Sequence, residues 1–177
     1  MKYYCVYSII ATDDSGFEPV SLEYAKEWMK VETDDDDGLI NHLITTARVQ
    51  CEDFTNTCLK GRTLKVWFNN SAGGINLPYC PLQSMVELTT DNGANVIDED
   101  NYSLFGIPFP RLEYPKEDRM TAEYIAGFET LPEPYMTAIM QQIGFLYENR
   151  GDVATHDKKN NLCELAKQTL TPYRRIW

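Results

Sequence analysis

The feature that most constrains this chain is an amphipathic stretch over residues 31–55, V-E-T-D-D-D-D-G-L-I-N-H-L-I-T-T-A-R-V-Q-C-E-D-F-T. Its apolar residues recur at steps of three and four, which places them on one face of a helix. They are Leu39, Ile40, Leu43, Ile44, Ala47, Cys51 and Phe54, with only Val49 off the stripe. The stretch predicts a long helix that ends near Asn56 and against which the other elements pack.

An aspartate run directly precedes the apolar stripe. It consists of Asp34, Asp35, Asp36 and Asp37. Free N–H groups and the positive end of the helix dipole favour negative charge at such a position. We therefore expect the run to form the helix start, and its carboxylates are also candidates for a charged functional surface.

Three shorter helices are expected in addition, one before the long helix and two after it. Ser21 is a good N-cap for a helix in which Leu22, Ala25 and Met29 share a face. A second helix starts at L-P-E-P (residues 131–134), where proline is tolerated in the first turn, and ends near residue 149. A last short helix reaches Leu170 and is stopped by Pro172.

The periodicity changes to that of strands between residues 61 and 128. Leu64, Val66 and Phe68 alternate with polar or amphipathic residues, and similar short patterns recur around residues 75–77, 84–90 and 121–128. We predict an α+β fold, in which a small bundle of about four helices carries a β-rich insertion of short antiparallel strands. The expected divisions are an N-terminal arm or strand (1–18), a helical hairpin (19–60), the insertion (61–128), the C-terminal helices (129–171) and a tail (172–177).

Charge and composition exclude several classes of function. The formal net charge of −11 over 177 residues argues against gripping nucleic acid through its phosphates. No apolar run approaches the ~20 residues that span a bilayer, and residues 1–11 do not read as a signal peptide. Five cysteines without a C-x-x-C pair predict buried thiols in a reducing compartment.

The sequence predicts no catalytic centre, metal site or cofactor. An EF-hand reading of the aspartate run fails, because Thr33 and Ile44 stand where the first and last ligands belong. Recognised hydrolase, metalloprotease and nucleotide-binding motifs are absent from the sequence. A small hydrolase that uses Cys51 or Cys58 with His42 remains the least favoured alternative.

The C-terminal tail has the composition of an interface segment. It consists of Tyr173, Arg174, Arg175, Ile176 and Trp177. Aromatic and arginine residues are enriched at the hot spots of protein interfaces. We expect the tail to be a docking segment, the alternative being that it packs on its own subunit. Trp67 is a further candidate for an interface, or else for the core.

Several motifs in fixed order resemble the head–tail connector (adaptor) proteins of tailed bacteriophages. The segments that carry the resemblance include V-S-L-E-Y-A-K-E-W-M-K-V-E-T-D-D-D-D-G-L-I and Y-I-A-G-F, and the strongest combination is L-x-x-A-K-x-W-x-K-V-x-x-D-D-D-D with Y-E-N-R-G. The resemblance extends over roughly residues 19–152. The sequence departs from the family pattern in residues 1–18 and in the tail.

This resemblance implies a structural subunit of the virion neck, assembled in the cytoplasm of a bacterial host. Connectors of the family form a ring, usually twelve-fold, between the portal and the next neck or tail protein. They extend the DNA channel, through which DNA passes without sequence-specific binding, and they have no catalytic residues to carry over. The nearest alternative is another neck or tail component, such as a stopper or a tail-completion protein.

Overall fold

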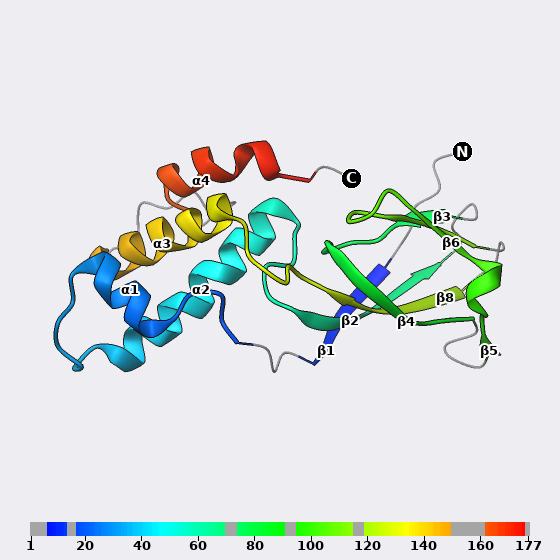
Figure 1. Ribbon diagram of the computed structural model, residues 1–177, viewed down its shortest axis with the longest axis horizontal. Coiled ribbons are helices and arrows are strands. Elements are labelled where there is room, and N and C mark those ends of the chain that lie inside the picture. Colours follow the sequence, from blue (N-terminus) through cyan, green and yellow to red (C-terminus); the bar gives the residue numbers. More distant parts are fainter. Residues whose placement is uncertain are drawn as a thin grey trace. The chain divides into compact units, whose positions relative to one another are not determined.

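The computed structural model describes residues 17–69, 74–90, 95–114, 119–149 and 162–175, together with the backbone of residues 7–13. The chain divides into two compact units, which Figure 1 shows with their elements labelled. A helical unit contains residues 17–59 and 130–176, and a β unit contains residues 60–129 and the N-terminal strand. The fold is therefore α+β, as predicted.

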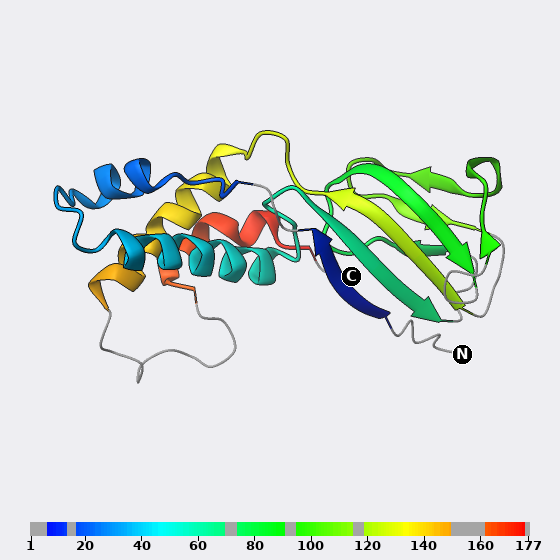
Figure 2. The same cartoon turned by 90° about the horizontal axis from the view of Figure 1, so that it is seen from below.

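In its described residues, the helical unit is a bundle of four helices. They are α1 (Leu22–Met29), α2 (Asp37–Thr55), α3 (Glu133–Glu148) and α4 (Glu164–Leu170), and α4 is followed by the 3-10 turn η2 (Thr171–Tyr173). Each of α2 and α3 packs against the other and against both short helices (Figure 2). The apolar stripe of α2 is buried as predicted except for Leu39, which is half-buried, and Val49 is exposed.

The ends of the helices follow local chemistry. Ser21 Oγ accepts a hydrogen bond of 3.2 Å from the N–H of Tyr24, which caps α1 as predicted. Asn56 ends α2 in the left-handed conformation, with φ of 53°. The start of α2 differs in detail from a side-chain cap: Asp36 occupies the N-cap position without a side-chain hydrogen bond to the helix backbone.

Two antiparallel sheets make up the β unit. The larger sheet has the order β1-β2-β8-β4-β5 and the smaller one the order β3-β7-β6. The strands of the larger sheet are β1 (Tyr7–Asp13), β2 (Arg62–Asn69), β4 (Leu82–Thr90), β5 (Asn95–Val96) and β8 (Arg119–Ala126). The smaller sheet contains β3 (Gly74–Asn76), β6 (Ser103–Phe105) and β7 (Arg111–Glu113), and the turn η1 (Glu99–Asn101) precedes β6.

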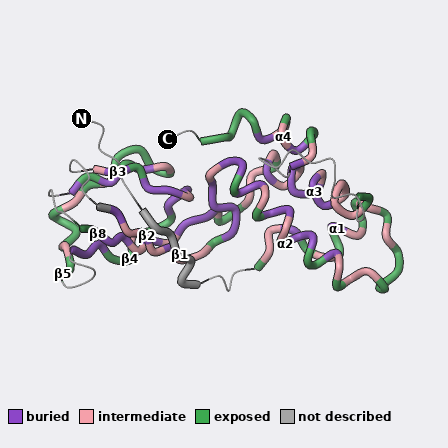
Figure 3. The backbone as a smooth tube through the Cα atoms, turned by 180° about the vertical axis from the view of Figure 1, so that it is seen from behind, coloured by how far each residue is buried: buried purple, intermediate pink, exposed green. Residues whose placement is uncertain are grey.

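Alternation along the strands sends one face of the larger sheet into a core. Leu64, Val66 and Phe68 of β2 are buried, and the Phe68 ring lies 5.5 Å from that of Tyr114, which follows β7. Figure 3 colours the backbone by the burial of each residue. Trp67 lies on the opposite face of β2 and is partly exposed. The core of the β unit therefore sits between its two sheets.

A buried ion-pair network holds the start and the end of the N-terminal helical segment. The guanidinium of Arg48 is 2% exposed and donates to Glu18 Oε2 and Glu52 Oε2, each at 2.8 Å. The second oxygen of Glu52 accepts from the N–H of Leu59 at 2.7 Å. The chain enters the helical unit near Glu18 and leaves its first segment at Leu59. The network on α2 therefore holds both ends of this segment.

We expect Arg48→Met to lower the free energy of unfolding by about 3–5 kcal/mol, because it leaves the buried carboxylate of Glu52 without its cation. Arg48→Met/Glu52→Gln should recover part of this loss, since no unpaired charge then stays buried. Chemical denaturation followed by circular dichroism measures both variants. The matched control is Lys65→Met, which breaks the exposed pair with Glu123 and should cost no more than about 1 kcal/mol. A loss in Arg48→Met no larger than in this control would contradict the assignment.

Gly127 is required where β8 leaves the sheet. Its φ is +119°, and a Cβ added there would lie 2.6 Å from the carbonyl oxygen of Lys60. We predict that Gly127→Ala destabilises the protein by more than about 1–3 kcal/mol, because steric overlap adds to the backbone strain. Gly38→Ala serves as the control, since its Cβ meets nothing within 4 Å and alanine is favoured in a helix. Equal midpoints of thermal unfolding in the two variants would refute this role.

Candidate functional site

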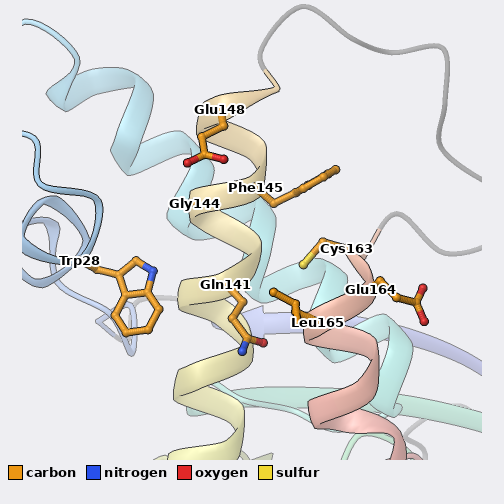
Figure 4. A pocket seen from close by; sticks show the side chains of 8 residues that line it. All are labelled: Trp28, Gln141, Gly144, Phe145, Glu148, Cys163, Glu164 and Leu165. Atoms are coloured by element: carbon orange, nitrogen blue, oxygen red, sulfur yellow. The ribbon is translucent and has the colours of Figure 1, made fainter.

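An open groove of about 450 Å³ crosses the surface of α3 in the helical unit. Its lining comes from α1, α3 and the start of α4, namely Trp28, Gln141, Gly144, Phe145, Glu148, Cys163, Glu164 and Leu165. Figure 4 shows the Trp28 indole on one side of α3 and the Leu165 side chain on the other. Two of the lining residues are strongly exposed for apolar side chains, with Trp28 at 49% and Leu165 at 62%.

The groove has room because α3 carries a glycine, Gly144, in its C-terminal half. A Cβ at Gly144 would meet only Trp28 Nε1, at 3.8 Å, so the absent side chain leaves open space beside the indole. The far wall is fixed by Gln142, which is fully buried in α3. Its amide accepts from the N–H of Cys163 at 2.7 Å and donates to Gln50 Oε1 at 2.7 Å. These bonds hold the start of α4 beside α3.

Acidic side chains border this groove. Glu148 and Glu164 are exposed, and no lysine or arginine is among the lining residues. The nearest cation in the described part of α4 is Lys167, whose Nζ lies 4.0 Å from Glu164 Oε2, at the limit of an ion pair. The groove is therefore suited to an apolar or aromatic ligand that carries positive charge.

The tail follows α4 and contacts its own helical unit. The Tyr173 ring lies 5.4 Å from that of Tyr135, and the Arg174 guanidinium lies 5.2 Å from the centre of the Phe54 ring. The N–H of Arg175 donates to the carbonyl of Thr55 at 3.0 Å. All three tail residues are nevertheless exposed, while Ile176 and Trp177 lie outside the described residues.

The aspartate run makes contacts within the helical unit. Lys26 Nζ bridges Asp34 at 2.6 Å and Asp37 at 2.7 Å, and Asp36 accepts from the Tyr147 hydroxyl at 2.6 Å. Asp34 and Asp35 stay exposed. The hydrogen bond from Lys26 lowers the pKa of Asp34, and the same pair raises the pKa of Lys26. The run thus joins α1 and α3 to the start of α2.

Metal and nucleophile chemistry receive no support from the described residues. Within them, no group of three or more histidine, cysteine, aspartate or glutamate side chains is placed to hold a metal ion. Burial raises the pKa of the Cys51 thiol, the opposite of what a reactive cysteine needs. His42 is exposed on the same helix, nine residues earlier and hence about 14 Å along its axis. None of the helices in the described ranges is long and apolar enough to span a membrane.

The sequence predicted the tail and the aspartate run as functional surfaces and did not predict the groove. No sequence pattern marks Trp28 or Leu165 as lining a groove, although both side chains are exposed. A glycine in the middle of a strongly helical stretch, at residue 144, was the available signal, because such a glycine usually has a packing or functional reason.

We predict that Lys26→Gln raises the pKa of Asp34 toward the ordinary aspartate value, because the charged hydrogen bond is lost. A carboxylate with a lowered pKa stabilises the folded state above its ordinary pKa, and this contribution disappears as the pH falls through the lowered value. The variant should therefore lose part of the dependence of stability on pH in the acidic range. Carboxyl NMR titration of Asp34 provides the measurement, and an unchanged pKa would contradict the bridge.

Comparison with known proteins identifies relatives. Residues 19–104 match the family described as phage gp6-like head-tail connector protein. No curated protein is similar enough to count as a match. Among solved structures, the chain resembles one from the "Neck of empty GTA particle computed with C6 symmetry", with a TM-score of 0.78, 15% identity and 96% of each chain covered.

Two other solved structures agree. One comes from the "Virion of native gene transfer agent (GTA) particle", with a TM-score of 0.75, 16% identity and 96% of each chain covered. Another is from the "Neck of native GTA particle computed with C12 symmetry", with a TM-score of 0.65, 17% identity and the same coverage. At these identities the likeness concerns the fold. The expected resemblance to head–tail connector proteins is confirmed by the match over residues 19–104, which make up slightly less than half of the chain.

Proposed function

We propose that this protein is a head–tail connector (adaptor) subunit that forms a ring in the neck of a tailed-phage-type virion. The ring lies between the portal and the next neck or tail protein, is twelve-fold and extends the DNA channel. The observation that carries the proposal is the family match over residues 19–104. The fold adds support, because the similar chains come from particles described as a neck with C6 or C12 symmetry.

The negative charge of the chain is better suited to lining a DNA channel than to binding the phosphates of nucleic acid. A formal net charge of −11 repels phosphate, so a channel lined with carboxylates lets DNA slide without sticking. Asp34 and Asp35 are exposed at the start of α2, and we place them among the residues that face the channel. Asp36 and Asp37 serve mainly to hold α2 to its neighbours.

The protein acts as an assembly component without a catalytic step. Buried Cys51, with its raised pKa, and exposed His42 do not form a nucleophile and base pair, which supports this reading. The tail, residues 173–177, supplies an interface to the portal or to a neighbouring subunit. Its three described residues are exposed aromatic and arginine side chains, the types that dominate binding hot spots.

Native mass spectrometry of the protein with and without purified portal tests the proposed role. The expected result is a complex in which one ring of this protein caps one portal ring. Single-particle electron microscopy of the same sample then gives the number of subunits. Absence of any portal complex, with binding instead to a tail-completion or tube protein, would overturn the assignment as the adaptor.

Deletion of residues 173–177 should abolish assembly while leaving the bundle folded. It removes the contact of Tyr173 with Tyr135, which is worth roughly 0.5–1.5 kcal/mol, and the contacts of Arg174 and Arg175 with the end of α2, so the thermal midpoint should fall while the bundle stays folded. Circular dichroism checks the fold, and sedimentation with the portal checks assembly. Normal assembly of the shortened protein would remove the tail from the interface.

A further inference from the structure

We propose that the ring closes head to tail by inserting the tail of one copy into the groove on the next copy's helical unit. The tail residues in question are Tyr173, Arg174 and Arg175, and the groove is the one lined by Trp28, Gly144, Leu165 and their neighbours. This inference rests on the proposed function, because it specifies how the subunits of that ring contact one another.

The groove has the properties of a binding surface that is empty in the single chain. Trp28 and Leu165 expose large apolar areas on either side of α3, and Gly144 leaves room between them (Figure 4). Large exposed apolar side chains around an open groove, with a polar border, are typical of an interaction site. Because Glu148 and Glu164 border it without a lining cation, its ligand should combine apolar or aromatic groups with positive charge.

The tail matches that chemistry. It presents an aromatic ring and two guanidinium groups in succession, and Arg174–Arg175 is the only pair of adjacent cations in the described part of the helical unit. The tail is also held in place: the N–H of Arg175 donates to Thr55, and its carbonyl accepts from Asn56 Nδ2 at 2.9 Å. A fixed backbone with exposed side chains loses little entropy on binding.

The positions of groove and tail exclude docking within one copy. Tyr173 packs on Tyr135 in the first turn of α3, whereas the groove surrounds Gly144 and Glu148 in the last turns. The lining residues of α3, from Gln141 to Glu148, are 6–13 residues from Tyr135, which is about 9–20 Å along the helix. The bonds of Arg175 to the end of α2 keep the tail at its own end of the bundle. The occupant of the groove is therefore the tail of a second copy.

Two different surfaces at opposite ends of one unit are what a ring needs. A head-to-tail interface joins unlike patches on successive copies and closes when the rotation between them is right. The pairing of arginines with glutamates fixes the direction of the contact, since two grooves or two tails brought together repel each other.

A mixing experiment with charge reversals tests the proposal. Variant one is Glu148→Lys/Glu164→Lys, and variant two is Arg174→Glu/Arg175→Glu. Each alone should associate at least roughly tenfold more weakly than the wild-type protein, because like charges meet at every interface. An equal mixture should assemble again, since the reversed groove of the first accepts the reversed tail of the second, and its rings should contain even numbers of subunits. Native mass spectrometry on the portal gives the composition.

Matched controls keep the test decisive. Glu32→Lys/Glu129→Lys changes the net charge equally at exposed sites outside the groove and should assemble normally. Gly144→Met fills the groove without altering charge and should block assembly, whereas Gly144→Ala should not. Normal assembly of either reversed variant, or a mixture that fails to recover, would overturn the groove contact while leaving the connector function intact. If the wild-type protein forms no ring on the portal, the proposed function itself fails.

Discussion

The buried guanidinium of Arg48 is the interaction on which the helical unit depends. It lies on α2 between two carboxylates from different parts of the chain, Glu18 before α1 and Glu52 one turn further along α2. Through Glu52 it also fixes Leu59, where the chain leaves the unit. A charge taken out of water needs this degree of pairing to be tolerated, so each member of the network makes the others necessary.

Around that network, α2 and α3 form the frame that positions the functional surfaces. Gln142 holds the start of α4 against α3, and the Tyr147 hydroxyl joins α3 to the start of α2. The groove therefore lies on rigid helices, and the tail is anchored at the other end of the same bundle. Such placement favours a connector, because a ring subunit has to present unlike surfaces in fixed positions.

Local patterns predicted most of the helices and many of the strands. The 3.6-residue stripe of α2, the Ser21 cap and the alternation through Val66 act over a few residues, so the sequence exposes them directly. The pairing of β2 with β8, such as Val66 opposite Ala122, joins residues far apart in the chain, and no local pattern encodes it. The sequence also did not predict the burial of Arg48, because arginine on the flank of a helix normally faces solvent.

The sequence predicted the tail as part of the candidate site but not the groove. Residue types identified the tail, but its attachment to Thr55 and Asn56 depends on how α4 packs. The groove combines Trp28, Gly144 and Leu165 from three helices, which only the folded bundle brings together.

The most direct test of the account is electron cryomicroscopy of the neck of a particle that contains this protein. We expect density for this α+β fold as a closed ring in contact with the portal, with the DNA channel running through it. Finding the chain at another position in the particle, or as isolated copies without a ring, would contradict the central claim.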